Sequence, residues 1–397
     1  MNEQRWLIDN VIQANGIDWD QPRSFYLAAP CGPEANADFG AIRMQVKKLA
    51  DAAPVFEGAA RRREARAQAA EADDALVTAR DNYFIAAVHW GAAQWPIDEL
   101  NDQQRFYDLR KRECYAAYAR LADHHVEAVS IPLGDTALPG WYHLPPGYQG
   151  GPLPTVVSIP GMDSFKEMSV SLQGDAWLSR GFAVLAIDGP GQYEAPLLGI
   201  PVTMEAWEAT GQAAMNWLVD RPEVDPARVG ISGVSFGSFF ATIAASREPR
   251  FKACAVIAVC HEPGFHTIFE EASPTFKERF MYMSAIDDED EFDRFCQGMT
   301  WEGYAEDISM PYLCVAGEFD ELSPLENSER LLATVTGPKR FVVYQGLRHA
   351  LGGPSANTGP FPWTMIADWM ADRMADKPFE SDRWFVETTG RIVKSDF

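Results

Sequence analysis

The chain has 397 residues, of which 47% are hydrophobic and 23% are charged. This balance is ordinary for a folded globular protein and excludes an intrinsically disordered chain. Acidic residues outnumber basic ones by 57 to 34, so the formal net charge is −23. Because nucleic acid and anionic membranes are bound through basic surfaces, we expect neither of them as a partner.

The cysteines and the N-terminus point to a reducing compartment. None of the six cysteines forms a C-x-x-C pair, and Cys254 and Cys314 lie in apolar, strand-like runs. This pattern fits buried free thiols better than a disulfide framework or a zinc site. The start, MNEQRWLIDNVIQ, lacks the basic and apolar regions of a signal peptide, and no apolar run is long enough to span a bilayer. We therefore expect a cytoplasmic protein.

Residues 1–125 are predicted to be helical. Ala, Arg and Glu are abundant there and few β-branched runs interrupt them, as in GAARRREARAQAAEADDALVTAR at 58–80. We take this region as a separate helical N-terminal segment, followed by a second domain at 126–397.

From residue 126 onward, short apolar runs alternate with helical patterns. The predicted strands are Val126–Ile131, Leu138–Leu144, Thr155–Ile159, Ala183–Ile187, Val229–Ser232, Ala253–Val259, Tyr312–Ala316 and Phe341–Tyr344. The first two are expected to form a hairpin around Gly134-Asp135, and helices are predicted at Met204–Asp220 and Ser238–Ser246. The alternation predicts an α/β fold with a mostly parallel, eight-stranded sheet and helices on both faces.

Two segments stand outside this alternation. A helical insertion at 261–308, rich in Phe, Met and acidic residues, follows one of the strands. Since ligands of open α/β sheets bind at the carboxyl ends of the strands, the insertion could roof a pocket. Alternatively, it is a surface excursion packed on its own apolar face. The tail after Lys377 carries scattered aromatic residues and is expected to pack back onto the domain.

The pentapeptide Gly233-Val234-Ser235-Phe236-Gly237 has the pattern G-x-S-x-G. Between a strand and a helix, this pattern is the nucleophile elbow, in which a strained turn exposes the serine hydroxyl. The N-terminus of the following helix then points toward the place where negative charge develops. Glycines around a serine are also common in ordinary loops, but the strand–turn–helix context favours Ser235 as a nucleophile.

A nucleophilic serine needs a base that is oriented by an acid, in the chain order serine, acid, histidine. GEFDELSP follows the strand YLCVA and offers Glu318, Asp320 and Glu321; GLRHALGG follows the next strand and offers His349. The spacing favours Asp320 as the acid, with Glu318 as the alternative.

Among the seven histidines, only His349 follows a late strand with glycines on both sides. His261 and His266 begin the insertion and are expected to line a pocket or support the insertion. The oxyanion donors are expected to be the backbone N–H groups of Phe236, which follows the serine, and of Met162, in the loop after the strand TVVSIP.

Five motifs in the chain resemble those of the α/β-hydrolase superfamily and, within it, the FrsA-like group. They are PGMDSFKE (Pro160–Glu167), IDGPGQYE (Ile187–Glu194), GVSFG, GEFDELSP and GLRHALGG. This group includes the pseudooxynicotine carbon–carbon bond hydrolase and hydrolases that shorten fungal polyketides. The resemblance covers most of the chain, including a long helical segment before the hydrolase core. It implies that Ser235 is the nucleophile, Asp320 the acid and His349 the base.

The chain departs from the group's pattern at two positions. Tyr193 stands where the group commonly has glycine, and Phe236 is bulkier than the leucine or methionine often found there. Neither departure touches the three residues that the resemblance makes catalytic. Both bear on the shape of the site and hence on the substrate.

These features together predict a serine hydrolase with a helical N-terminal cap that closes over the active site. We expect a small carbonyl compound as substrate, either a carboxylic ester or a compound with a carbon–carbon bond beside a ketone. Aromatic residues make up 12% of the chain, which favours an apolar or aromatic substrate. No metal or organic cofactor is implied, and the resemblance allows a homodimer through the helical segment. The alternatives are a hydrolase-fold binding or regulatory protein and a peptidase, although no propeller-like repeat precedes the core.

Overall fold

The computed structural model describes residues 2–352 and 357–397, which divide into two compact units. One unit consists of Met1–Ala128 and Glu167–Asp175, and the other of Val129–Lys166 and Ala176–Phe397. Within the ranges that are described, no helix is both long enough and apolar enough to cross a membrane.

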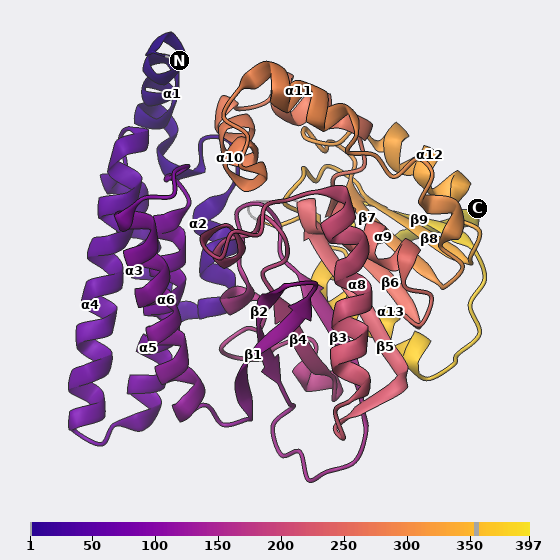
Figure 1. Cartoon of the computed structure of the whole chain (residues 1–397), viewed down its shortest axis with the longest axis horizontal. Coiled ribbons are helices and arrows are strands. Elements are labelled where there is room, and N and C mark those ends of the chain that lie inside the picture. The colour runs from indigo at the N-terminus through magenta and orange to yellow at the C-terminus, as the bar shows by residue number, and fades with distance from the viewer. Residues whose placement is uncertain (1, 353–356) are drawn as a thin grey trace. The chain divides into compact units, whose positions relative to one another are not determined.

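The first unit is built from helices. They are α1 (Asn2–Asn15), α2 (Arg23–Ala28), α3 (Asn36–Gln45), α4 (Ala52–Ala72), α5 (Leu76–Gln94) and α6 (Asp102–Leu121). The long helices α4, α5 and α6 lie side by side, and α5 packs against both of the others (Figure 1). Helix α5 is buried all round from Asp81 to Gln94, because small and aromatic residues occupy every face of it.

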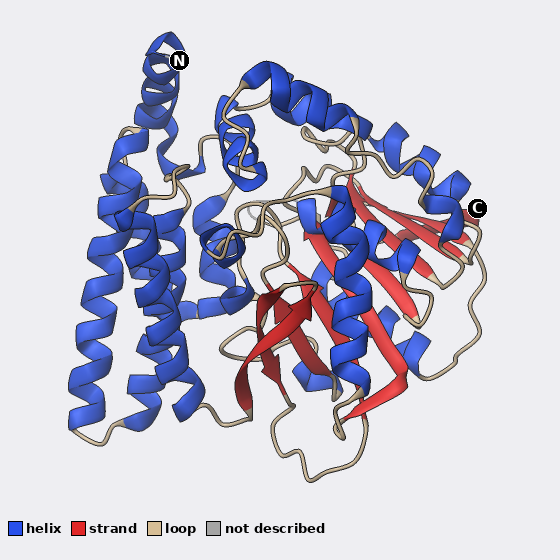
Figure 2. Ribbon diagram, viewed as in Figure 1, coloured by secondary structure: helices blue, strands red, loops and turns tan. Residues whose placement is uncertain are grey.

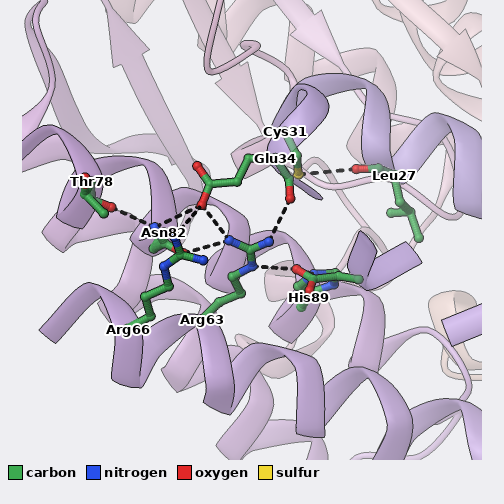
Figure 3. Close-up of polar contacts among 9 residues, drawn as sticks. Leu27, Cys31, Glu34, Arg63, Arg66, Thr78, Asn82 and His89 are labelled. Carbon is green, nitrogen blue, oxygen red and sulfur yellow. Dashed lines mark hydrogen bonds and ion pairs between the residues drawn. The ribbon is translucent and has the colours of Figure 1, made fainter. Parts of the chain in front are cut away.

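A polar cluster around the buried Arg63 ties three helices of this unit together (Figure 3). The guanidinium group of Arg63 donates hydrogen bonds to the side chains of Glu34, Asp38 and Asn82. His89 Nε2 lies 3.3 Å from Asp38 Oδ2. Burial lowers the pKa of His89, so the ring is neutral near pH 7. Burial alone would raise the pKa of Asp38, but His89 and Arg63 outweigh it and hold this pKa below its ordinary value.

Replacing Arg63 with methionine is expected to lower the free energy of unfolding by about 3 kcal/mol. The variant leaves the Asp38 carboxylate, which is largely buried, without its guanidinium partner. The midpoint of urea unfolding, followed by the far-ultraviolet circular dichroism of the helices, measures the effect. Arg62→Met is the matched control, since Arg62 is exposed on the same helix. Equal midpoints for the two variants would contradict the stabilising role of the cluster.

The second unit is built on a sheet of ten strands in the order β1-β2-β4-β3-β5-β6-β7-β8-β9-β10 (Figure 2). The strands are β1 (Val126–Leu133), β2 (Thr136–His143), β3 (Leu153–Ile159), β4 (Ala183–Ile187), β5 (Val224–Ser235), β6 (Ala253–Val259), β7 (Tyr312–Gly317), β8 (Lys339–Tyr344), β9 (Asp382–Val386) and β10 (Ile392–Asp396). The pairs from β4 through β9 are parallel, whereas β2 is antiparallel to β4 and β10 is antiparallel to β9.

The sheet has ten strands, whereas the sequence predicted eight. The missing strands, β9 and β10, come from the tail, which the sequence predicted only to pack back onto the domain. Most residues of these two strands are partly or fully exposed. Their sequences, DRWFV and IVKSD, therefore lack the apolar runs that mark the buried strands of the same sheet.

Helices cover both faces of this sheet. The helices of this unit are α7 (Glu194–Leu197), α8 (Met204–Val219), α9 (Phe236–Arg247), α10 (Pro274–Ser284), α11 (Glu289–Gln297), α12 (Leu325–Thr334) and α13 (Pro362–Met374). Gly230 and Gly233 of β5 face opposite sides of the sheet. A Cβ atom at Gly230 would lie 2.6 Å from Met370 of α13, and one at Gly233 would lie 2.9 Å from Ala241 of α9. Helices α13 and α9 therefore lie on opposite faces.

The insertion after β6 packs onto the start of α9. It contains α10, α11 and a π-helical turn at Thr267–Glu271. The rings of Phe265, Phe269 and Phe280 lie with their centroids 4.8, 5.9 and 4.8 Å from that of Phe236. The insertion is thus not an excursion packed only on its own apolar face. Its aromatic side chains form one core with the residue that follows Ser235.

Candidate active site

Ser235 lies on a sharp turn between β5 and α9. Its backbone has φ 56° and ψ −127°, in a region that residues other than glycine rarely adopt. The flanking glycines make this turn possible. A Cβ atom at Gly233 would lie 1.9 Å from the carbonyl oxygen of Gly237, and one at Gly237 would lie 2.4 Å from that of Pro160. The local sequence therefore permits a turn that larger residues would block.

The structure brings Ser235, His349 and Asp320 together in one line of hydrogen bonds. Ser235 Oγ lies 2.9 Å from His349 Nε2. On the other side of the ring, His349 Nδ1 lies 3.0 Å from both carboxylate oxygens of Asp320. Asp320 Oδ1 also accepts the backbone N–H groups of Leu322 and Ser323, both at 3.0 Å. These two backbone hydrogen bonds hold the carboxylate in position for its contact with the imidazole.

His349 is buried, with 3% of its surface exposed. Burial disfavours the charged ring, but the Asp320 carboxylate outweighs it and holds the pKa of His349 well above its ordinary value. An imidazole in this setting readily accepts a proton at its Nε2 atom, which faces the Ser235 hydroxyl.

The three acids that the sequence offered occupy different places. Asp320 faces the His349 ring, whereas Glu318 accepts the backbone N–H of Gly346 at 2.9 Å. Glu321 accepts the backbone N–H of His349 at 3.0 Å and so anchors the histidine through its main chain. The spacing of these acids did not reveal this role of Glu321. The last glycine of GLRHALGG, Gly353, lies outside the described residues.

Cys260 lies beside the serine, a position that no motif in the sequence predicted. Its Sγ atom lies 3.8 Å from Ser235 Oγ. In the pairing of β5 with β6, Val234 lies opposite Ile257 but Ser235 lies opposite Val259. Ala258 is therefore an extra residue with φ 51°, a bulge at the level of the elbow. An apolar run such as ACAVIAVC carries no signal of a bulge.

The expected oxyanion donors belong to Phe236, which follows Ser235, and to Met162, which follows a glycine that lies against Ser235. Phe236 opens helix α9, and no carbonyl of that helix precedes it to accept its N–H. Met162 follows Gly161, whose backbone lies directly against the serine. A Cβ atom at Gly161 would lie 2.9 Å from Ser235 Cβ and 3.0 Å from the carbonyl oxygen of Val234. Only glycine allows the loop after β3 to come this close.

The two histidines of the insertion make other contacts. His261 is fully buried, its Nδ1 lies 3.0 Å from Ser328 Oγ, and burial lowers its pKa to about 3. His266 is exposed and lies 3.5 Å from Glu271. Neither forms the hydrogen bond to Ser235 that His349 forms.

The chain matches the family model described as "Esterase FrsA-like" over residues 52–289. It is 32% identical over 195 residues to the α/β hydrolase xenA of Xenoacremonium sinensis, which covers 46% of this chain and 44% of that protein. It is 28% identical over 267 residues to the hydrolase ORFZ of Pyricularia oryzae, which covers 61% of each. The chain thus spans about half the length of the curated relatives that it matches.

A solved structure shares the fold over nearly the whole chain. The crystal structure of 2,6-dihydroxy-pseudo-oxynicotine hydrolase superimposes with a TM-score of 0.76. The match covers 90% of this chain and 98% of the other, at 23% sequence identity. At this identity the likeness establishes a common fold.

Proposed function

Because the chain belongs to the FrsA-like esterase family of α/β hydrolases, we propose that it is a serine hydrolase with Ser235 as its nucleophile. One observation carries the proposal: Ser235 Oγ lies 2.9 Å from His349 Nε2, and Asp320 holds the opposite ring nitrogen. A base within hydrogen-bond reach of the hydroxyl, itself oriented by an acid, is what activates a serine.

The reaction begins when Ser235 Oγ attacks a carbonyl carbon of the substrate. The hydroxyl proton passes to His349 Nε2, and the π electrons of the carbonyl move onto its oxygen. Asp320 accepts the Nδ1–H of His349, which keeps the ring in the required tautomer and stabilises the imidazolium that forms. The N–H groups of Phe236 and Met162 donate to the developing oxyanion.

The tetrahedral intermediate then collapses and expels the leaving group, which takes the proton from His349. Water, activated by the same histidine, releases the acyl group from Ser235. The leaving group of a carboxylic ester is an alcohol. A 1,3-diketone instead expels an enolate, stabilised by its second carbonyl, which takes the proton from His349 on carbon and leaves as a ketone. The same three residues serve both kinds of leaving group.

The surroundings of the elbow favour an apolar or aromatic acyl compound. Phe236 follows the nucleophile, and its ring contacts those of Phe240, Phe265 and Phe280. An apolar wall of this kind excludes water from one side of the serine and strengthens the polar interactions on the other.

A paired assay tests the proposal. An aryl ester and an aryl 1,3-diketone of matched size are offered to the wild-type protein and to Ser235→Ala. We expect hydrolysis of at least one substrate by the wild type and none by the variant. Turnover of the ester alone indicates a carboxylesterase, and cleavage of the diketone indicates a carbon–carbon bond hydrolase. If both proteins cleave a substrate equally, Ser235 is not the nucleophile. If neither substrate is cleaved, the result favours a binding role over the proposed hydrolase.

A further inference from the structure

The loop after β4 carries the motif DGPGQYE, to which the reaction above gives no role. Gln192 of this loop is 1% exposed, and its side chain reaches across to the loop after β3. Its Nε2 atom donates to the carbonyl oxygen of Pro160 and lies 3.5 Å from that of Gly161. Its Oε1 atom accepts the backbone N–H of Gly189 at 2.9 Å, which holds the side chain in place.

These contacts fix the peptide planes on either side of Gly161. The N–H of Gly161 donates to Ser164 Oγ at 2.7 Å, while the carbonyl of the same peptide accepts from Gln192. The next peptide joins Gly161 to Met162. In a trans peptide the C=O and N–H groups point in opposite directions. With the Gly161 carbonyl turned toward Gln192, the N–H of Met162 points away from it.

A second connection holds the same two loops together. Lys166 Nζ donates to Asp188 at 2.9 Å and to Glu194 at 2.6 Å, and the Lys166 backbone N–H donates to Asp188 at 2.8 Å. All three side chains are buried. The lysine and the acids therefore join the two loops through buried ion pairs, while Gln192 joins them at Gly161, whose backbone lies against Ser235.

We propose that Gln192 is a positioning residue that orients the Gly161–Met162 peptide so that its N–H faces the oxyanion. This role rests on the proposed serine-hydrolase function. An amide side chain is required because it donates to a carbonyl and accepts from an N–H at the same time.

The test compares Gln192→Met and Gln192→Glu with the wild type. Methionine keeps the length of the side chain without a donor. Glutamate keeps an oxygen that accepts the N–H of Gly189. Its second oxygen replaces the amide donor and faces the carbonyl oxygens of Pro160 and Gly161. Gln212→Met is the matched control, since Gln212 is exposed on α8. Three quantities are measured on an aryl ester: kcat, KM and the inhibition constant of an arylboronic acid. The boronic acid forms a tetrahedral adduct with the serine and so reports on oxyanion binding.

We expect kcat to fall by about 10- to 100-fold in both variants, with KM changed less than threefold. The inhibition constant of the boronic acid should rise by a similar factor, while the acid limb of the pH profile stays near that of the control. A kcat within threefold of the wild type in both variants would overturn the inference. A loss of activity without a matching rise in the inhibition constant of the boronic acid would also overturn it.

Failure of the inference is distinguishable from failure of the proposed function. If wild-type turnover depends on Ser235 but the Gln192 variants match the control, only the positioning role is wrong. If wild-type turnover does not depend on Ser235, the proposed function is wrong and the inference falls with it.

Discussion

Replacing Ser235 with alanine is expected to lower kcat/KM by about 10⁴- to 10⁶-fold. The variant removes the only atom that forms a bond to the substrate, while the geometry of His349 and Asp320 remains. Alanine and serine are equally disfavoured at the φ of 56° that residue 235 adopts, so the unfolding midpoint should change little. Steady-state kinetics on an aryl ester measures the effect, with Ser179→Ala as the control because Ser179 is an exposed serine.

Cys260 makes this experiment more demanding. Its thiol lies 3.8 Å from Ser235 Oγ and would remain beside His349 in the variant. Residual activity that iodoacetamide abolishes would come from the thiol, and the double variant Ser235→Ala/Cys260→Ala should remove it. Activity within tenfold of the wild type in the double variant would show that Ser235 is not the nucleophile.

The second large effect is expected from Asp320→Asn, which should lower kcat by about 10⁴-fold. Asparagine keeps one oxygen for the backbone N–H groups of Leu322 and Ser323 but can present an amide N–H to His349 Nδ1. The ring would then carry its proton on Nε2, where it cannot accept the proton of Ser235.

The pH profile of Asp320→Asn should change as well. The wild-type carboxylate raises the pKa of His349, and the base works only when the ring is neutral. Activity of the wild type should therefore be lost as the pH falls through the pKa of His349, which lies above the ordinary value of about 6.5. In the variant the opposing effect of burial remains, so the acid limb of kcat/KM should move to lower pH. Glu318→Gln is the control, and an equal loss in that variant would contradict the assignment of the acid.

The sequence was sufficient to choose three residues whose side chains meet in the structure. In a parallel sheet the carboxyl ends of neighbouring strands lie along one edge. A serine after β5, an aspartate after β7 and a histidine after β8 therefore approach one another once the strands are recognised. The buried strands were easy to recognise because each is a nearly continuous apolar run. Choosing Asp320 rather than Glu318 depended on spacing alone, and the structure places only Asp320 against the ring.

What the sequence did not reveal depends on long-range pairing. The bulge at Ala258, which brings Cys260 to the serine, arises from the register of β6 against β5. The contact of Gln192 with Pro160 joins residues that are 32 positions apart, and no local pattern marks it. Strands β9 and β10 were missed for another reason, because partly exposed strands at the edge of a sheet carry mixed polar sequences.

The most direct test of the central claim is to map the adduct of a fluorophosphonate probe by mass spectrometry of the digested protein. We expect one modified peptide, with the added mass on Ser235, and no modification of Ser235→Ala under the same conditions. Labelling of another residue at the same rate in both proteins, or a wild-type protein that the probe does not modify, would contradict the claim.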